Sequence, residues 1–210
     1  MGWEIRTEAP KPESPHPQVY TGNMKAWGAG LAVAALCSAQ LPGDLQRTFD
    51  LAERRIVRLP PREFPELPGT VTLELERRGC RVPQEAFTKT PHNVVRGEFV
   101  KPGQTDWAVL CSRGGASTIL VFWNGSGTAP AEIAKAEDRN YLQGITPSQI
   151  GFSRGIRAVG REFIMRHYQA YGGPAPPTVE HQGIDDAFIE KASVTHYFHN
   201  GKWLQLTGAD

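Results

Sequence analysis

The residues best suited to chemistry include a serine at the centre of a hydrolase-like pattern. Residues 151–155 read GFSRG, which fits G-x-S-x-G, a turn that presents a nucleophilic serine in many hydrolases. Possible partners follow in the hydrolase order: Asp185 or Asp186, then His196 or His199. The turn also needs an apolar strand entering the serine, but the preceding GITPSQI is polar and contains Pro147. We therefore expect Ser153 to cap a helix that begins near Ile156, with a serine hydrolase as the alternative.

A metal-dependent hydrolase is the second enzymatic alternative, because the chain contains six histidines. His196 and His199 are three residues apart on a predicted strand, so their side chains would point to opposite faces. His181 lies near Asp185 and Asp186 in the sequence, which is a looser arrangement for metal ligands. We expect neither a catalytic metal nor another cofactor, and we do not expect an enzyme.

Two other groups of residues are candidates for binding rather than catalysis. The stretch EHQGIDD, residues 180–186, predicts an exposed loop whose ligand contacts would come from His181, Asp185 and Asp186. Aromatic side chains crowd the predicted sheet and form a candidate binding surface: Trp107, Trp123, Tyr197 and Trp203. A solvated acidic turn and ordinary core packing are the respective alternatives.

The composition excludes one class of partner. Lysine and arginine number 23 against 22 aspartates and glutamates, so a net charge of +1 creates no field that would attract nucleic acid. Hydrophobic residues make up 40% of the chain and charged residues 21%, which is typical of a domain with a packed core. We expect a folded domain that binds no nucleic acid.

The first residues have the plan of a secretory leader behind an unrelated extension. Residues 24–39, MKAWGAGLAVAALCSA, place a lysine after a methionine, then an apolar stretch, then small residues before a cut after Ala39. Residues 1–23 are polar and rich in proline, which predicts a disordered extension from a misassigned upstream start. A buried apolar helix behind a disordered tail is the alternative. The prediction is a periplasmic or secreted protein with no membrane span in the mature chain.

The cysteine count agrees with export. If Cys37 leaves with the leader, Cys80 and Cys111 remain, and an exported chain with two cysteines is expected to form one disulfide. Closing that loop would stabilise the fold by roughly 3 kcal/mol in the chain-entropy model. A metal-binding or reactive thiol pair is the alternative, but the sequence has no C-x-x-C motif.

The remaining patterns predict one α+β domain over residues 69–210, after a short helix and a proline-rich linker in residues 40–68. Strands are expected at 93–99, 106–111 and 117–123, and helices at 69–79 and 156–171. Asn200-Gly201 predicts a C-terminal hairpin, since both turn residues must adopt positive φ. We expect the meander and this hairpin to form one antiparallel sheet of about five strands, covered by the amphipathic helix 156–171.

Residues 96–110, RGEFVKPGQTDWAVL, resemble the β-hairpin of FG-GAP or VCBS-type repeats. The matching residues are Gly97, Phe99, Gly103, Asp106, Ala108 and Val109. Loops of that family often bind calcium through carboxylates and amides, which here would be Glu98, Gln104 and Asp106. Lys101 and Pro102 occupy ligand positions, so we expect Asp106 to cap a turn and Trp107 to pack instead.

Together with the C-terminal hairpin, this stretch resembles small exported bacterial proteins that have no assigned activity. The resemblance and the leader together predict an exported domain that acts by binding, with a protein or a surface glycan as its partner. The serine and metal-dependent hydrolases are the alternative function.

Overall fold

The computed structural model describes residues 43–209, which lie within the compact unit Gln40–Asp210. The predicted extension 1–23, the predicted leader 24–39 and Cys37 lie outside the described residues. Helix α1, Gly43–Arg54, begins the described part and agrees with the short helix expected in residues 40–68. The 3-10 helix η1, Pro61–Glu63, follows in the proline-rich stretch.

Helix α2, Gly69–Arg77, confirms the helix predicted at 69–79. Pro68 precedes it in an extended conformation, and Gly79 ends the segment with a φ of 69°, a left-handed conformation that glycine adopts without strain. Val71 and Leu75 are one helical turn apart and are both completely buried, so this face of α2 packs into the core.

The first large sheet is the predicted meander. Its strands are β3 (Val94–Gly97), β4 (Asp106–Arg113), β5 (Ala116–Phe122) and β6 (Ala131–Glu137), in the antiparallel order β3-β4-β5-β6. Strand β4 is buried on both faces, so its side chains alternate between two cores. Ala108 and Leu110 join the core shared with the second sheet, whereas Val109 and Cys111 face α2.

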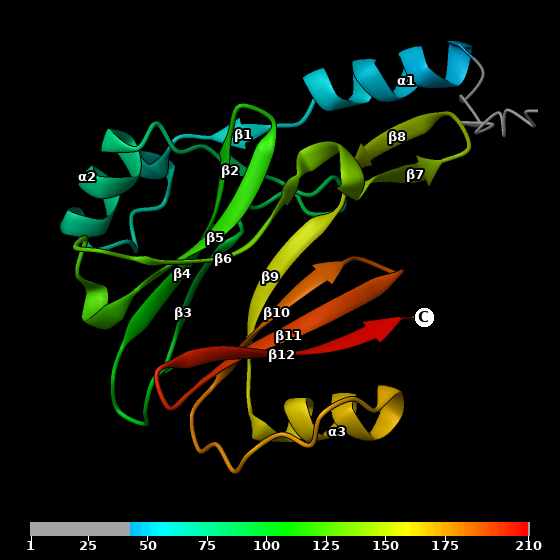
Figure 1. The fold of residues 1–210 in the computed structure, drawn as a ribbon. Helices are drawn as coiled ribbons and strands as arrows, with labels where there is room; N and C mark the ends of the chain where they lie inside the picture. Colours follow the sequence, from blue (N-terminus) through cyan, green and yellow to red (C-terminus); the bar gives the residue numbers. More distant parts are fainter. Residues whose placement is uncertain (1–42, 210) are drawn as a thin grey trace, which may run out of the picture. The chain divides into compact units, whose positions relative to one another are not determined.

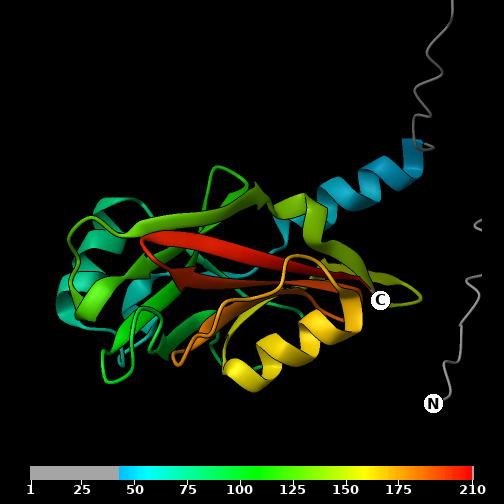
Figure 2. The ribbon, with the colours of Figure 1, turned by 60° about the horizontal axis from the view of Figure 1, so that its bottom comes forward.

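The second large sheet contains the C-terminal hairpin. Its strands are β9 (Arg154–Val159), β10 (Gly183–Phe188), β11 (Ala192–His199) and β12 (Lys202–Ala209), in the order β12-β11-β10-β9. The predicted turn is confirmed, with φ of 48° at Asn200 and 79° at Gly201. Helix α3, Arg161–Tyr171, lies along one face of this sheet (Figures 1 and 2) and buries Ile164 against Tyr197 and Leu206.

Two short pairs of strands complete the fold. Strand β1 (Arg58–Leu59) pairs with β2 (Val82–Pro83), and β7 (Leu142–Thr146) pairs with β8 (Gln149–Phe152). The 3-10 helices η2, Trp123–Gly125, and η3, Asp138–Tyr141, lie on either side of β6 in the chain. Figure 1 shows the β7–β8 hairpin close to α1, and the two are in contact.

The side chain of Asn93 joins the two large sheets. Its Nδ2 donates to the carbonyl oxygens of Pro83 and Arg154 at 2.7 and 3.1 Å, and its Oδ1 accepts from the backbone N–H of Ile156 at 2.9 Å. The residue is 2% exposed and has a φ of 70°, which asparagine tolerates better than most residues. One amide thus bonds to three backbone groups.

Three predictions about the fold are wrong. Residues 43–209 contain four sheets rather than one of about five strands, because the meander and the C-terminal hairpin belong to different sheets. The helix expected at 156–171 is a strand followed by a helix, and Ser153 therefore precedes β9 and caps nothing. The helix cap is Gly160, which makes no side-chain bond.

The expected exposed loop at 180–186 is also wrong, because Gly183–Phe188 is a central strand. Strand β10 pairs with β9 on one side and β11 on the other, and Asp185 and Asp186 are buried at 0% and 5% exposure. Burial of these carboxylates is possible because each is paired with an arginine, Arg157 or Arg154.

The predicted disulfide is confirmed. Cys80 and Cys111 are bonded, with their Cα atoms 5.3 Å apart, and both are 2% exposed. The bond joins the segment after α2 to β4, and the adjacent residues Arg81 and Ser112 form an isolated antiparallel bridge. The covalent bond and the backbone bridge together fix the wall of the cleft described next.

Candidate anion-binding cleft

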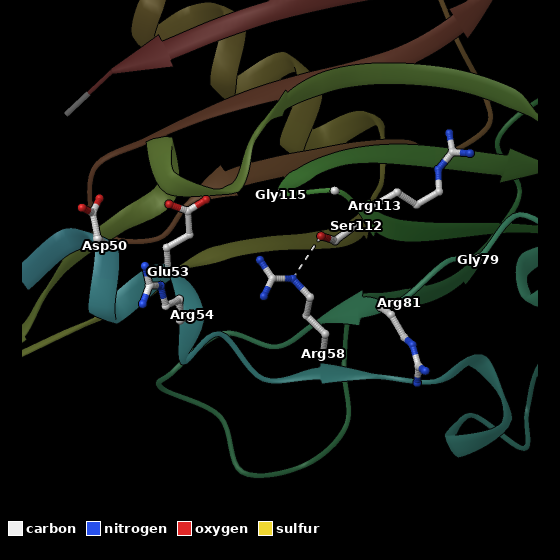
Figure 3. A pocket seen from close by; sticks show the side chains of 10 residues that line it. Asp50, Glu53, Arg54, Arg58, Gly79, Arg81, Ser112, Arg113 and Gly115 are labelled. Atoms are coloured by element: carbon white, nitrogen blue, oxygen red, sulfur yellow. Dashed lines mark hydrogen bonds between the residues drawn. The ribbon is translucent and has the colours of Figure 1, made fainter. Parts of the chain in front are cut away.

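A cleft of about 560 Å³ lies beside the disulfide, between α1, β1 and the turn that joins β4 to β5. It is lined by Asp50, Glu53, Arg54, Arg58, Gly79, Arg81, Ser112, Arg113, Gly114 and Gly115. All of these residues are charged, polar or glycine. Figure 3 shows Arg58 reaching from β1 toward Ser112, with the α1 residues on one side of it.

The lining has an excess of positive charge. Four arginines face two carboxylates, which leaves an excess of two positive charges. Asp50 and Glu53 also lie 3.2 and 3.6 Å from the guanidinium of Arg139, outside the lining. Arg139 and Asp138 both lie outside the lining and carry opposite charges. Counting these two neighbours therefore leaves the excess at two positive charges.

Arg58 is fixed by a three-membered network. Its Nη2 donates to Asp138 Oδ2 at 2.7 Å, and its Nε donates to Ser112 Oγ at 3.1 Å. Ser112 Oγ in turn donates to the same Asp138 oxygen at 2.5 Å. Asp138 is fully buried, and within residues 43–209 its other oxygen, Oδ1, has no hydrogen-bond partner.

The other three arginines have a different environment. Arg54, Arg81 and Arg113 are exposed, and no carboxylate of the described residues lies within salt-bridge distance of them. Arg81 and Arg113 leave the paired segments in different directions (Figure 3). These guanidinium groups can therefore reorient toward a ligand at the cost of side-chain entropy.

Local backbone chemistry brings the main chains of Arg81 and Arg113 close together. The bridge between Arg81 and Ser112 consists of two backbone hydrogen bonds of 3.2 and 2.7 Å. The turn after Arg113 uses Gly114 and Gly115 at φ of 59° and 86°, so β5 returns at once and leaves Arg113 at the rim. The cleft thus depends on the disulfide segment and on a glycine turn.

The hydrolase alternative placed its nucleophile at Ser153, which is completely buried. Its Oγ donates to the carbonyl oxygen of Tyr141 at 3.0 Å, and its own N–H donates to the same oxygen at 2.9 Å. His196 lies near a carboxylate, with Nε2 3.9 Å from Asp186 Oδ2. The structure thus brings Asp186 and His196 together, while the Ser153 hydroxyl bonds to the backbone.

Asp186 belongs to a buried ion pair with Arg154. Nε and Nη2 of Arg154 donate to the two carboxylate oxygens at 2.8 and 2.7 Å. Nη1 donates to Ser117 Oγ at 2.9 Å, and Nη2 also donates to the carbonyl oxygen of Ala134 at 2.6 Å. The guanidinium lies 4.6 Å from the centre of the Tyr141 ring.

Charge pairing outweighs burial in this cluster. Burial pushes the pKa of Asp186 upward, but the hydrogen bonds and positive charge of Arg154 bring that pKa below its ordinary value. Burial also raises the pKa of Tyr141, and the negative charge of Asp186 raises it further. Both ionisable partners of the pair therefore remain charged at neutral pH, with Tyr141 neutral beside them.

The other predicted loop residues lie apart from the cleft. Asp185 Oδ2 accepts from Arg157 Nε at 2.8 Å on the sheet face that also bears Thr195. His181 Nδ1 is 2.9 Å from the carbonyl oxygen of Gln182, and His199 Nε2 is 3.0 Å from Asn200 Nδ2. His181, Asp185 and Asp186 do not form one contact loop.

The calcium-like loop is organised by Asp106, as expected for a capped turn. Asp106 is completely buried, and its Oδ2 accepts from the backbone N–H groups of Phe99 and Val100 at 2.9 and 3.3 Å. Its Oδ1 accepts from Gln104 Nε2 and from the N–H of Asn124, both at 2.8 Å. Glu98 is not among these contacts. The described residues contain no group of three or more His, Cys, Asp or Glu that could hold a metal ion.

The four aromatic residues of the candidate surface do not share one exposed face. Trp107 and Tyr197 are buried at 7% and 2% exposure, in separate cores. Trp123 and Trp203 stack with ring centres 5.9 Å apart, and Phe198 packs against both. Trp123 and Trp203 pack against the core between the two large sheets.

The cleft was not predicted, although part of it had a signal in the sequence. Arg81 follows Cys80, and Arg113 lies two residues after Cys111, so the predicted disulfide already placed both arginines together. The near-zero net charge of the chain concealed this local excess. Arg58 and Asp138 are 80 residues apart, and no local pattern links them.

Comparison with family models, with curated proteins and with solved structures found no match. Within residues 43–209, none of the helices has the length and the apolar character needed to cross a membrane.

Proposed function

We propose that this protein is an exported binding domain whose arginine cleft recognises the acidic groups of a surface glycan. The observation that supports this most directly is the excess of two positive charges on the cleft lining. Three of its arginines have no carboxylate within salt-bridge distance among the described residues, so an anionic ligand would supply the missing partner. Guanidinium groups bind carboxylate and phosphate in a bidentate manner, which suits this class of ligand.

The lining favours a glycan over a protein. Interfaces between proteins depend on buried aromatic and apolar side chains at their centre. This cleft has none, since its residues are arginine, aspartate, glutamate, serine and glycine. A chain of hydroxyls and carboxylates matches such a surface, because each polar group of the ligand finds a polar partner.

Export is supported by the disulfide between Cys80 and Cys111, since such bonds persist in oxidising compartments. Binding rather than hydrolysis is supported by the burial of Ser153 and by its bonds to the Tyr141 backbone. The arginine cleft itself contains no histidine or cysteine, so it offers fewer groups for proton transfer than for anion binding.

The test is calorimetric titration of the full chain with an oligosaccharide that contains uronic acid. The carboxyl-reduced form of the same oligosaccharide is the matched neutral probe, and an oligoglutamate peptide tests the protein alternative. We expect the acidic oligosaccharide alone to bind, with an affinity that falls as salt rises.

The variant Arg81→Ala with Arg113→Ala should weaken that affinity about tenfold or more, since hydrogen bonds to charged groups contribute roughly 1.5–3 kcal/mol each. Arg161→Ala, which removes an exposed arginine on α3, is the matched control and should bind normally. Equal binding of the neutral form, or tighter binding of the peptide, would contradict the proposal.

A further inference from the structure

A second cavity, of about 300 Å³, lies between η3 and the strands of the C-terminal sheet. Its walls include Tyr141 of η3, Asp186 and Phe188 of β10, and Ser193 of β11. It shares no lining residue with the arginine cleft. Its volume is at the lower end of cavities that bind small molecules, which suits a single ring.

Asp186, the charged residue in the wall of this cavity, can accept further hydrogen bonds. Each oxygen of Asp186 accepts one hydrogen bond from Arg154, at 2.8 and 2.7 Å. A carboxylate offers about four acceptor positions, so two are not used by Arg154. Because Arg154 already balances the charge, a cation would gain little here, whereas a neutral hydroxyl donor would gain a hydrogen bond.

The remaining walls combine aromatic and hydroxyl groups. The rings of Tyr141 and Phe188 are 5.5 Å apart and nearly perpendicular, and both are half-buried. They present an apolar wall of the kind that packs against the C–H groups of a saturated ring. Asn140 and Thr207 add an amide and a hydroxyl, which can both donate and accept.

We infer that this cavity binds one neutral pyranose ring, with a ring hydroxyl donating to Asp186 and ring C–H groups packed against Tyr141 and Phe188. A pyranose has hydroxyl groups along its edge and C–H groups on its faces. The cavity has the complementary arrangement, with hydrogen-bonding groups beside an aromatic wall. This second site would recognise a neutral sugar, in contrast to the acidic groups proposed for the arginine cleft.

The experiment is saturation-transfer NMR on the full chain with glucose, galactose, mannose and N-acetylglucosamine as separate probes. Cyclohexanol is the matched control ligand, because it has a ring of the same size with one hydroxyl. We expect at least one pyranose to receive saturation and cyclohexanol to displace it poorly. Absence of a signal from all four sugars, or equal competition by cyclohexanol, would overturn the inference.

Two variants locate the binding. Asn140→Ala with Thr207→Ala removes two exposed rim groups and leaves the core unchanged. Each lost neutral hydrogen bond should weaken pyranose binding roughly two- to tenfold. Val194→Phe, at the cavity residue directly opposite Asp186, should abolish the signal by filling the cavity, with circular dichroism as the check that the fold is retained. Unchanged binding in the rim variant would overturn the inference even if Val194→Phe does not fold.

The result is separable from the test of the arginine cleft. Arg81→Ala with Arg113→Ala should leave pyranose binding unchanged, because neither residue lines this cavity. The rim variant should likewise leave binding of the acidic oligosaccharide unchanged. Loss of pyranose binding in the arginine variant would overturn the assignment of two separate sites.

Discussion

Two buried aspartates, Asp138 and Asp186, are each paired with an arginine that also donates to a serine of the β4–β5 hairpin, and the two arginines differ in exposure. Ser112 of β4 and Ser117 of β5 are directly opposite each other in the antiparallel pair. Ser112 bonds to Arg58, and Ser117 bonds to Arg154. The Arg58 side chain is 23% exposed, whereas that of Arg154 is completely buried.

The difference teaches how one set of residue types can serve two purposes. Arg154 has hydrogen bonds from all three of its nitrogens, so nothing in that cluster is available to a ligand through Arg154. The cluster of Arg58, Ser112 and Asp138, which we call the open cluster, is less complete, since one oxygen of Asp138 has no partner among residues 43–209. The fully bonded guanidinium of Arg154 stabilises one fold, whereas the partly exposed guanidinium of Arg58 lines a cleft and can respond to a ligand.

The largest expected loss of stability comes from breaking the cluster of Arg154, Asp186 and Ser117, which we call the closed cluster. Arg154→Met should lower the free energy of unfolding by about 3–5 kcal/mol, because it leaves Asp186 buried without its main partner. Urea denaturation measures this effect, and Arg161→Met is the control with an exposed arginine. Adding Asp186→Leu should recover part of the loss. A cost below about 1 kcal/mol would show that Arg154 and Asp186 behave like a surface pair.

The same variant should reverse the contribution of Asp186 to the pH dependence of stability. In the native protein the pKa of Asp186 is lowered by Arg154 against the effect of burial, so its stabilisation is present above the unfolded pKa and is lost as pH falls through the folded pKa. Without Arg154, burial raises the folded-state pKa of Asp186 above its unfolded value. The stabilisation by Asp186 is then present below the unfolded pKa and is lost as pH rises through the folded pKa.

The difference in free energy of unfolding between the native protein and Arg154→Met, here called the gap, should therefore become smaller as pH falls from about 7 to about 4. Urea denaturation at several pH values in this range measures the gap. A gap that is constant with pH would contradict this account.

The closed cluster also explains which strands could not be predicted. The strands β4 and β5 and the C-terminal hairpin were predicted because they consist of apolar runs and an Asn-Gly turn. Strand β10 reads GIDDAF, and two adjacent carboxylates are a pattern typical of a solvated loop. The arginines that neutralise them lie on β9, so their burial depends on a tertiary contact that periodicity does not record.

The strand β9 was mistaken for a helix for the same reason. It reads RGIRAV, in which Arg154 and Ile156 face the core while Arg157 is exposed. An arginine at a core position disrupts the alternation expected of a strand, and the following α3 extended the helical pattern backward. In the cleft, the cysteines could have placed Arg81 and Arg113, whereas Arg58 required the fold.

A smaller effect is expected from breaking the open cluster. Arg58→Met should lower the free energy of unfolding by about 1–3 kcal/mol, because Asp138 keeps the hydroxyl of Ser112 as a donor. Water at the partly exposed site can also replace the lost guanidinium. Thermal and urea denaturation beside Arg154→Met measure the difference. A cost as large as that of Arg154→Met would contradict the description of this cluster as open.

The smallest expected effect separates the two opposed serines. Ser117→Ala should cost only about 0.5–1 kcal/mol, since Nη1 of Arg154 also has the carbonyl oxygen of Ser117 at 3.2 Å. Ser112→Ala should cost more, because Ser112 accepts from Arg58 and donates to the buried Asp138. Urea denaturation of the two single variants measures this order. Equal costs would show that the Ser112 hydroxyl contributes no more than an ordinary hydrogen bond, and the open cluster would then consist of Arg58 and Asp138 alone.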